Sequence, residues 1–538
     1  MCSFATLPSM KARIAFTGFF MTILALSGFG DDLEVRFKRV KGVSDAICFV
    51  TNAVLIERGS KKTPNPLAMW AAIQEEEKAN AKKGFFVRVD FVLKPEEGSD
   101  IRCRAELPPP KLWDGRMWGQ GNSGHGGALP SLTAYTAAGT AGVTTDLGTW
   151  KITDCGKTNS KIWPESVRRD FEWRATHLMT VYGRKIVKAF YGRPCDKAYF
   201  CGGSTGGRQA MSEAIRFPED YDGIISILPD NNAAVNEMAV WHLWRQTHGD
   251  DGKLLFTTNE MRVVADAAVD YRRSKEPEPF ARHTISDGRL SETDIDGFLA
   301  LAAERCPSIK DGDKLARLRR LYIPLVHDGR CCFNGFAPGS YLGKNMTWMG
   351  IVNLRSYLMS KGIGYRDWKK IGWNVIDGYL KEYGPRFNAC SPDLSAFRRR
   401  GGKIIMTAGW EDQTIPPNPI IDYYERVCEK DGGIEKTLGY FRLFCIPGCA
   451  HGGGKGRVMT ASPGGAQVRR MLTDWCERGV APERLVCNWN SRRMTLPVAA
   501  YPGLFVHDAN GGWVRKETPR GAARIDGRCL ETKTDGLD

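Results

Sequence analysis

The chain has 538 residues, of which 42% are hydrophobic and 25% are charged, and its formal net charge is +15. This composition is ordinary for a globular protein, and it excludes a largely disordered protein. The basic excess is spread along the chain, without an arginine-rich arm, a zinc-finger spacing or a basic stripe interleaved with aromatic residues. Nucleic-acid binding is therefore not indicated. A solvated basic surface explains the charge, and attraction to anionic substrates is compatible with it.

The first thirty residues have the pattern of a secretory signal peptide. Lys11 and Arg13 precede an apolar stretch from 14 to 26, and small residues follow it. A membrane anchor is the alternative, but thirteen apolar residues are fewer than the roughly 20 that a spanning helix needs. We therefore expect residues 1–30 to be removed on export. The mature protein is expected to be secreted or periplasmic and to have no membrane span.

Sixteen cysteines suit an oxidising compartment and predict structural disulfides, whose connectivity cannot be read from the sequence. Two close pairs, Cys195 with Cys201 and Cys445 with Cys449, lack the repeated C-x-x-C spacing of a zinc site. We expect neither a metal nor another cofactor from this pattern.

The N-terminal part alternates strand and helix signals. The segments 85–93 and 101–107 are strand-like, and the two are candidates for a hairpin. A glycine-rich loop occupies 117–127 after a short apolar segment, and 141–148 resembles the end of a strand. The periodicity then predicts a helix over 167–192, which ends at a glycine.

A strand, a sharp turn and a second helix follow. "KAYF" at 197–200 reads as a strand, "CGGSTGGRQ" as the turn, and the helix is expected to continue to about Phe217. The apolar run 221–229 predicts another buried strand, as in a parallel sheet that is covered on both faces.

The pattern changes after residue 230. From there to about 390 the sequence is mostly helical, with little strand signal, whereas 401–417 and 440–456 again read as strand followed by loop. The simplest architecture is an α/β domain, formed by 31–230 and 391–538, with a mostly helical insertion at 231–390.

Ser204 is the candidate nucleophile. It lies at the centre of Gly202-x-Ser204-x-Gly206, and its strand–turn–helix context is that of a nucleophile elbow. A packing turn is the alternative, because glycine and serine are common in turns. A serine hydroxyl also needs a base and a carboxylate that orients this base.

Two later strand ends supply these partners. His451 follows the apolar segment 440–446 in a glycine-rich loop, and Asp412 follows 403–410, with Glu411 as a competitor. The order of serine, aspartate and histidine is that of α/β-hydrolases. Oxyanion donors are expected from the amide of Thr205 and, in the loop 117–127, from Ser123 or Gly124. A plain glycine-rich turn is the alternative for this loop.

The sequence resembles the tannase and feruloyl esterase family, which also includes mono(2-hydroxyethyl) terephthalate hydrolase. The resemblance runs along most of the chain, and it rests on "LWDGRMWGQGN", "DFEWRATH", "YFCGGSTGGRQAMSEAIRFPEDYDGII", "RRGGKIIMTAGWEDQTIPP", "FRLFCIPGCAHGGG" and "DWCERGVAPERLV". It implies a secreted serine esterase with an α/β-hydrolase fold and a large, mostly helical lid inserted before the catalytic acid. The implied catalytic triad is Ser204, Asp412 and His451.

Two departures from the family pattern stand out. Gly203 and Gly452 occupy the positions where members typically carry two cysteines that are joined by a disulfide. One hypothesis is that a disulfide between Cys201 and Cys449 replaces the missing one. The calcium loop of the family's lid is not clearly retained in 285–296, where Asp287 alone does not make a site.

The expected function is hydrolysis of a carboxylic ester through an acyl-enzyme. The resemblance implies an aromatic acyl group of the galloyl or hydroxycinnamoyl type, in a small molecule or linked to a polymer. Aromatic side chains of the lid suit such a pocket, although they equally suit a lid core. The alternatives are an esterase for non-aromatic acyl groups, a peptidase, and a non-catalytic surface or polymer-binding protein on the same fold.

Overall fold

The computed structural model separates the chain into two units. The first comprises Met1–Trp118, Ser131–Thr144 and Leu178–Lys197, and the second comprises Gly119–Pro130, Thr145–His177 and Ala198–Asp538. The structure describes residues 30–57, 84–154, 157–158, 162–275, 289–346, 352–364, 367–451, 461–463, 465–489, 494–507, 513–517 and 524–534. Residues 1–29 of the predicted signal peptide lie outside these residues. No helix among them is long and apolar enough to cross a membrane.

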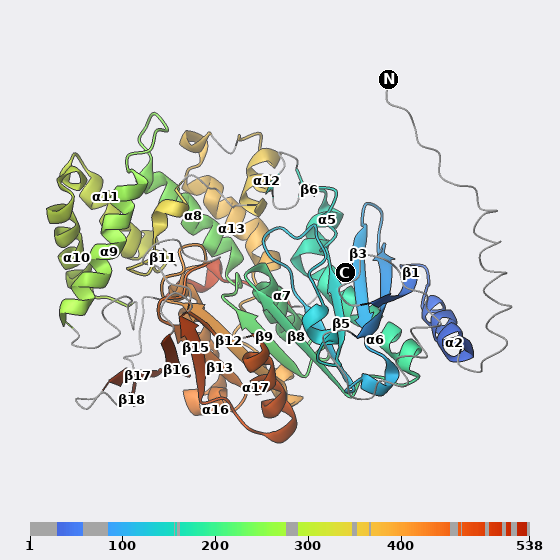
Figure 1. The fold of residues 1–538 in the computed structure, drawn as a ribbon. Coiled ribbons are helices and arrows are strands. Elements are labelled where there is room, and N and C mark those ends of the chain that lie inside the picture. Colours follow the sequence, from blue (N-terminus) through green and yellow to red (C-terminus); the bar gives the residue numbers. More distant parts are fainter. Residues whose placement is uncertain are drawn as a thin grey trace. The chain divides into compact units, whose positions relative to one another are not determined.

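The first unit contains an antiparallel group of strands (Figure 1). Strand β2 (Phe85–Leu93) pairs with β3 (Ile101–Leu107) on one side and with β1 (Cys48–Glu57) on the other. Buried and less buried side chains largely alternate along β2, because one face of an antiparallel sheet can stay near solvent. The predicted hairpin is confirmed.

The other elements of the first unit are helices and two further strands, some of which extend into the second unit. They are α2 (Gly30–Lys41), η1 (Pro110–Leu112), β4 (Arg116–Gln120), α4 (Thr133–Thr136), β5 (Ala141–Thr145) and α6 (Ala175–Tyr191).

The second unit is built on parallel strands. They follow the order β8 (Lys197–Gly203), β9 (Gly223–Ile227), β12 (Lys403–Gly409) and β13 (Phe441–Ile446). Strands β9 and β12 are buried along almost their whole length, as expected for strands covered on both faces. Helix α7 (Thr205–Arg216) packs on β9, α15 (Pro417–Asp431) on β12, and α17 (Gly465–Arg478) on both. The predicted strands and the parallel pairing are confirmed.

The segment between β9 and β12 is mostly helical, as the sequence predicts (Figure 1). Only a short hairpin interrupts its helices within the described residues. The elements are α8 (Ala233–Thr247), α9 (Thr258–Lys275), α10 (Glu292–Arg305), η4 (Pro307–Lys310), α11 (Lys314–Tyr322), β10 (Leu325–His327), β11 (Arg330–Phe333), η5 (Leu342–Lys344), α12 (Val352–Ser360), η6 (Trp368–Lys370), α13 (Trp373–Phe387) and α14 (Ser395–Arg399). The boundaries 231–390 and a role as lid stay predictions.

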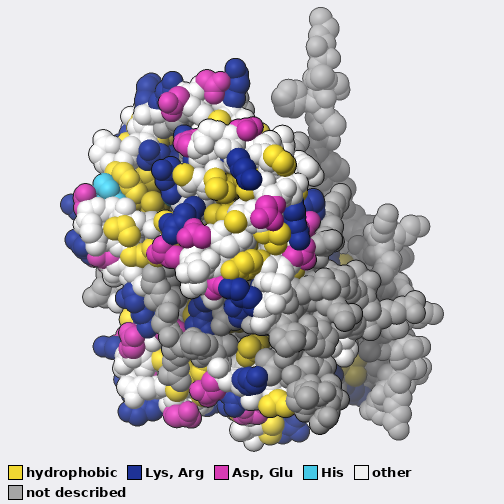
Figure 2. All heavy atoms as spheres, turned by 90° about the vertical axis from the view of Figure 1, so that its left-hand side faces the viewer, with side chains coloured by type: hydrophobic (Ala, Val, Ile, Leu, Met, Phe, Trp, Pro, Cys, Tyr) yellow, Lys and Arg dark blue, Asp and Glu magenta, His cyan; other side chains and the backbone are white. Residues whose placement is uncertain are grey.

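Charges of both signs cover the face of the helical segment that Figure 2 presents. Lys and Arg side chains are interspersed with Asp and Glu there, and ion pairs join them. Arg319, for example, pairs with Glu292 and with Asp296, each at 2.7 Å. This face is a solvated mixed surface and not a basic patch.

One predicted helix contains an irregular turn. The helix expected over 167–192 forms as α5 (Glu165–Arg169) and α6, but a π-helical turn at Asp170–Arg174 separates them. Such turns are often found at functional sites. The five residues of this turn are all buried.

Short antiparallel pairs and two turns complete the second unit. They are β6 (Thr153–Asp154), β7 (Lys157–Thr158), α16 (Ile434–Leu438), β14 (Ala461–Pro463), β15 (Arg484–Trp489), β16 (Met494–Ala499), β17 (Gly503–His507), β18 (Trp513–Glu517) and η7 (Gly527–Cys529).

Candidate active site

Ser204 stands at the turn between β8 and α7, with backbone angles of φ 59° and ψ −122°. A positive φ is strained for a residue with a side chain, and this turn exposes the hydroxyl at the end of the strand. The turn requires a close approach of two glycines, since a Cβ on Gly202 would lie 2.3 Å from the carbonyl oxygen of Gly206. The predicted strand, sharp turn and helix are confirmed.

His451 bridges Ser204 and Asp412. Its Nε2 lies 3.1 Å from Ser204 Oγ, and its Nδ1 lies 2.9 Å from Asp412 Oδ2. An ionised carboxylate only accepts hydrogen bonds, so Nδ1 carries the proton that Asp412 accepts. In the neutral imidazole, Nε2 is then the acceptor for the serine hydroxyl. This arrangement is that of a nucleophile, a base and an orienting acid.

Asp412 is fully buried and held on both of its oxygens. Its Oδ1 accepts from the amides of Thr414 and Ile415 at 2.9 and 2.8 Å, while Oδ2 accepts from His451. Asp412 is therefore the acid that bonds to Nδ1 of the histidine.

The glycine-rich loop 117–127 meets the serine turn. The Thr205 hydroxyl donates to the carbonyl of Gly124 at 2.6 Å, and the Asn122 amide donates to Gln209 Oε1 at 2.8 Å. Thr205 begins α7, and the first amides of a helix have no partner within the helix. Of the two expected loop donors, Gly124 is therefore tied directly to the serine turn. Ser123 lines only the outer of the two cavities described next.

Two cavities of the second unit meet at Ser204. The inner pocket, of about 580 Å³ including its mouth, is lined by Gly124, His125, Phe171, Ser204, Thr205, Asp230, Asn236, Glu237, Val240, Phe387, Thr414 and Ile415. The outer groove is larger, and the loop 120–130 and His451 line it.

A known protein family matches the parts of the chain that contain these residues. Residues 87–271 and 369–516 match the family described as tannase and feruloyl esterase. The chain belongs to this family. It is a carboxylic ester hydrolase of the tannase and feruloyl esterase type.

Relatives agree with this assignment. The feruloyl esterase B of Aspergillus niger is 28% identical over 434 residues, which cover 74% of this chain and 79% of that protein. A probable feruloyl esterase B-2 of Aspergillus flavus is also 28% identical, with the same coverage of both chains.

Solved structures share the fold. Feruloyl esterase B from Aspergillus oryzae has a TM-score of 0.71 at 20% identity, covering 88% of this chain and 97% of that one. Tannin acyl hydrolase from Aspergillus niger has a TM-score of 0.69 at 16% identity, covering 92% of this chain and 95% of that one. The predicted α/β fold is confirmed, with mixed and mostly parallel strands.

In this esterase, Arg208 organises one wall of the inner pocket. Its guanidinium lies 4.9 Å from the ring centre of Phe171 and 4.7 Å from that of Phe387, and it donates to the carbonyls of Phe171 and Glu172 at 3.0 and 2.6 Å. Burial lowers the pKa of Arg208 to about 10, so it stays charged at neutral pH. The helix that begins at the serine turn therefore also fixes the π-helical turn.

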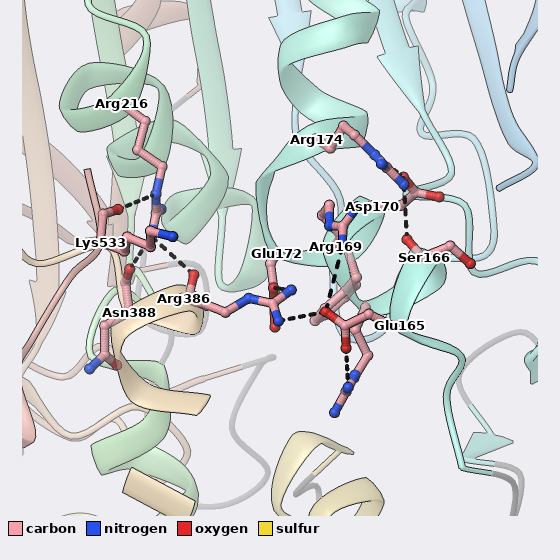
Figure 3. Close-up of polar contacts among 12 residues, drawn as sticks. Glu165, Ser166, Arg169, Asp170, Glu172, Arg174, Arg216, Arg386, Asn388 and Lys533 are labelled. Atoms are coloured by element: carbon pink, nitrogen blue, oxygen red, sulfur yellow. Dashed lines mark hydrogen bonds and ion pairs between the residues drawn. The ribbon is translucent and has the colours of Figure 1, made fainter. Parts of the chain in front are cut away.

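A network of ion pairs continues behind this wall (Figure 3). Arg386, next to Phe387, reaches Glu172 at 2.9 Å and Glu165 at 2.5 Å. Arg216 of α7 donates to the carbonyls of Arg386 and Asn388. Burial raises the pKa of Glu172, an effect that Arg386 opposes.

Two acids of the inner pocket, Asp230 and Glu237, are not among the residues predicted from the sequence. Asp230 lies three residues after β9, just as Asp412 lies three residues after β12. The same spacing could have identified it. Glu237 lies on α8, where the sequence shows no distinguishing signal, and burial raises the pKa of Glu237 to about 7. Burial also raises the pKa of Asp230.

Of the other candidate histidines, His125 lines both cavities at Ser204, whereas His177 and His242 bond to groups outside the lining of these cavities. His177 Nδ1 lies 2.7 Å from Asp220 Oδ2, and His242 Nε2 lies 2.9 Å from the carbonyl of Arg320.

One group of metal-ligand type occurs within the described ranges, formed by His177, Glu213 and Asp220. Burial and the neighbouring Asp220 raise the pKa of Glu213 well above its usual value. A proton held between the two carboxyl groups therefore accounts for this cluster as well as a cation would. Asp287, from the weak calcium pattern, lies outside the described residues.

Cys449 is a buried free thiol, so the hypothesis of a shifted bond to Cys201 is wrong. Burial raises the pKa of Cys449 well above its usual value and favours the neutral thiol. A Cβ on Gly203 would lie 3.6 Å from its closest neighbour, the carbonyl oxygen of Ile227, so a side chain fits there. Gly452, the other position of the family's bond, lies outside the described residues.

Proposed function

We propose that the protein hydrolyses esters of aromatic acids through an acyl-enzyme on Ser204. The observation that carries this proposal is the continuous hydrogen-bond chain from Ser204 Oγ through His451 to Asp412. In such a chain the imidazole removes the hydroxyl proton as the oxygen attacks the acyl carbon.

The chemical steps follow from the donors and acceptors present. Ser204 Oγ bonds to the acyl carbon, and the oxyanion is stabilised by the amides of Thr205 and Gly124, with Ser123 as the alternative donor. The bond to the alcohol oxygen then breaks, and His451 gives this oxygen its proton. Water attacks the acyl-serine by the same route, so that the acid and the free serine are released. Asp412 holds the imidazole in the required tautomer.

The two cavities suit the two parts of the ester. His451 must protonate the leaving alcohol, and it lines the outer groove. The acyl group then occupies the inner pocket, where Phe171 and Phe387 form flat apolar walls. These walls support an aromatic acyl group of the galloyl or hydroxycinnamoyl type, as the names of the relatives suggest.

The helical segment between β9 and β12 supplies much of this pocket. Asn236, Glu237 and Val240 of α8 and Phe387 of α13 line it. This contribution supports a lid that selects the acyl group. Export to the cell exterior or periplasm is part of the proposal and rests on the leader pattern of residues 1–30.

The test is hydrolysis of methyl gallate, methyl ferulate and a short aliphatic nitrophenyl ester by the wild-type protein and by Ser204→Ala. We expect turnover of an aromatic ester that is lost in the variant. Aliphatic turnover alone would keep the serine mechanism and reject the aromatic class. Equal activity in Ser204→Ala would reject the nucleophile. Inactivity of folded wild-type protein on all three esters would favour the non-catalytic binding protein.

A further inference from the structure

A segment near the end of the chain, residues 524–533, lies as a strap across elements of the second unit. Within this strap, the amide of Asp526 donates to the carbonyl of Cys331 in β11 at 2.7 Å. Further along, the carbonyl of Lys533 accepts a hydrogen bond from Arg216 of α7 at 3.0 Å (Figure 3). The strap therefore contacts hairpin β10–β11 near one of its ends and α7 near the other.

The strap also holds the chain where it leaves α13, whose last residue lines the inner pocket. Asn388 Nδ2 donates to the carbonyls of Cys529 and Glu531, both at 3.2 Å. The thiol of Cys390 donates to the carbonyl of Leu530, also at 3.2 Å. The sulfur of Cys390 thus bonds to the backbone of the strap and not to the thiol of Cys529.

Two buried cysteines meet where the strap contacts the hairpin. Cys332 of β11 is 0% exposed, and Cys529 of η7 is 2% exposed. The Cys529 thiol donates a hydrogen bond to the sulfur of Cys332, which lowers the pKa of Cys332 and raises the pKa of Cys529. Both are thiols in this structure, which therefore presents the reduced form of the pair. The fold brings together two sulfurs that are roughly 200 residues apart in the sequence.

The neighbouring Cys331 has a different orientation. Consecutive side chains of a strand point to opposite faces, so only one of the two cysteines of β11 faces the strap's sulfur. The Cys331 thiol donates to the carbonyl of Phe333 at 3.6 Å. The geometry thus selects Cys332 as the partner of Cys529.

A metal centre is another use of paired thiols. A structural zinc site needs four ligands, most often Cys and His. Among the residues that the structure describes, no third His, Cys, Asp or Glu joins Cys332 and Cys529 in a group that could hold an ion. The pair is therefore better suited to a covalent bond between its two sulfurs.

We propose that Cys332 and Cys529 form a disulfide that fastens the strap to hairpin β10–β11. This bond goes beyond the proposed function and does not depend on it, because neither cysteine lines a cavity at Ser204. Both sulfurs are buried in the folded protein, so the bond forms while the chain folds and an oxidant still reaches them. The oxidant is a reactive disulfide, such as glutathione disulfide.

The exchange takes place in two steps. The thiolate of Cys332 attacks one sulfur of glutathione disulfide, which forms a mixed disulfide and releases one glutathione thiolate. The sulfur of Cys529, after loss of its proton, then attacks the Cys332 sulfur, so that the protein disulfide forms and the second glutathione leaves. The two protein thiols lose two electrons, which reduce one glutathione disulfide, and their two protons end on the two glutathione molecules.

Such a bond has two physical consequences. It closes a loop of roughly 200 residues, which removes conformational freedom from the unfolded chain and thereby stabilises the fold. Burial of both sulfurs also keeps reductants away. The bond should therefore persist in the native protein and open only when the protein unfolds.

The first experiment locates the bond by peptide mapping. Full-length protein is produced through an oxidising secretory pathway, its free thiols are blocked with iodoacetamide, and it is digested with trypsin without reductant. Cleavage after Lys and Arg places the two cysteines in peptides 331–344 and 529–533. We expect mass spectrometry to find these peptides joined and a reductant to separate them. Recovery of 529–533 with an alkylated cysteine, or joined to a different peptide, would overturn the proposal.

Two serine variants identify the sulfur on the hairpin. Cys331→Ser should retain the joined peptides, whereas Cys332→Ser should lose them. The opposite result would overturn the assignment of Cys332. Tandem mass spectrometry of the joined wild-type peptides assigns the sulfur independently, so the assignment is decided even if a variant does not fold.

The second experiment measures what the bond does for the fold. Dithiothreitol should lower the midpoint of thermal unfolding of the wild-type protein, and this decrease should be smaller in Cys529→Ser by roughly 2–5 °C. Cys306→Ser, a matched change at a half-buried cysteine whose sulfur contacts Ser308, should retain the wild-type decrease. Equal decreases in wild type and Cys529→Ser would overturn the role of the bond in fastening the strap. None of these measurements is an activity, so a failure of ester hydrolysis would leave their results unchanged.

Discussion

The proposed catalytic groups and the inner pocket hold their polar atoms in different ways. Both oxygens of Asp412 have partners within the protein, and His451 continues the chain to Ser204. In the pocket, Asn236 Oδ1 is buried without a partner in the described structure, and burial keeps the pKa of Glu237 near 7. The first arrangement is complete within the protein, whereas the second contains an acceptor that the protein leaves without a partner.

This difference is the one expected between catalytic groups and groups that bind a substrate. A preorganised set of bonded groups lowers the barrier because it does not have to reorganise during the reaction. An unsatisfied acceptor instead raises the free energy of the empty pocket and thereby favours a ligand that satisfies it. The difference predicts that variants of the first set change kcat for every ester, whereas variants of the second change the ranking of esters.

The largest expected effect is that of Asp412→Asn. The amide cannot replace the carboxylate that fixes the protonated Nδ1 of His451, so kcat should fall on the order of 10⁴-fold for every ester tested. The measurement is steady-state kinetics on two aromatic esters. Glu411→Gln, which changes the neighbouring acid, is the control and should stay within a few-fold of wild type. A similar loss in both variants would contradict the assignment of Asp412.

Next in size is Arg208→Met, which removes the charge that joins the serine helix to the pocket wall. The carbonyls of Phe171 and Glu172 lose their donors, and Glu172 loses a neighbouring positive charge. We expect the free energy of unfolding to fall by about 3–5 kcal/mol.

Urea denaturation measures this change in stability. Arg305→Met, at an ion pair with Asp270 on the exposed helical face, is the matched control and should cost less than about 1 kcal/mol. Equal losses in the two variants would show that Arg208 has no special structural role.

Two adjacent glycines offer a sharper comparison at the serine turn. A Cβ on Gly202 would lie 2.3 Å from a backbone oxygen, whereas one on Gly203 would meet nothing within 3.5 Å. Gly202→Ala should therefore cost about 1–3 kcal/mol and, by displacing the serine, about 10²-fold in kcat. Gly203→Ala should behave like wild type in both assays. The idea that close packing fixes this turn fails if the two variants are alike.

These predictions also show what the sequence could reveal. Ser204, Asp412 and His451 could be predicted as candidates because each follows a strand, so that a local pattern places it at the same edge of a parallel sheet. The helices of the segment between β9 and β12 could also be predicted, because the periodicity of apolar residues is a local pattern.

The pocket could not be predicted in this way. Phe171 and Phe387 lie far apart in the chain, yet their ring centres are 6.1 Å apart and Arg208 lies over both rings. The unpaired oxygen of Asn236 depends on which way its amide faces Asp230, and the raised pKa of Glu237 depends on burial by several helices. The π-helical turn in the predicted helix 167–192 likewise depends on contacts made by a later helix.

Another effect concerns pH and Glu237. Its pKa is about 7 in the folded protein against 4.5 for an ordinary glutamate, so the folded state binds the additional proton between these values. The contribution of Glu237 to the free energy of unfolding is therefore fully present below pH 4.5. It is lost as the pH rises through 7, and the loss amounts to about 3 kcal/mol.

Urea denaturation at pH 5 and pH 8 tests this effect. The decrease between the two pH values should be smaller in Glu237→Gln than in wild type, because the amide does not titrate. Glu435→Gln, at an exposed position, should retain the wild-type decrease. If Glu237→Gln retained it as well, the pH dependence would come from other buried acids.

The smallest effect is expected on the mixed-charge face of the helical segment. Arg319 pairs with Glu292 and Asp296, but the three side chains are 33%, 66% and 54% exposed, so water and salt screen the attraction. Arg319→Ala should change the free energy of unfolding by less than about 1 kcal/mol and leave the ranking of esters unchanged. Urea denaturation at low and high salt, with the ester ratios, measures both. A loss above about 2 kcal/mol, or an altered ranking, would mean that the outer charges of the segment affect the pocket that its inner residues line. The separation between catalysis at the strand ends and recognition by the pocket residues would then have to include the whole segment.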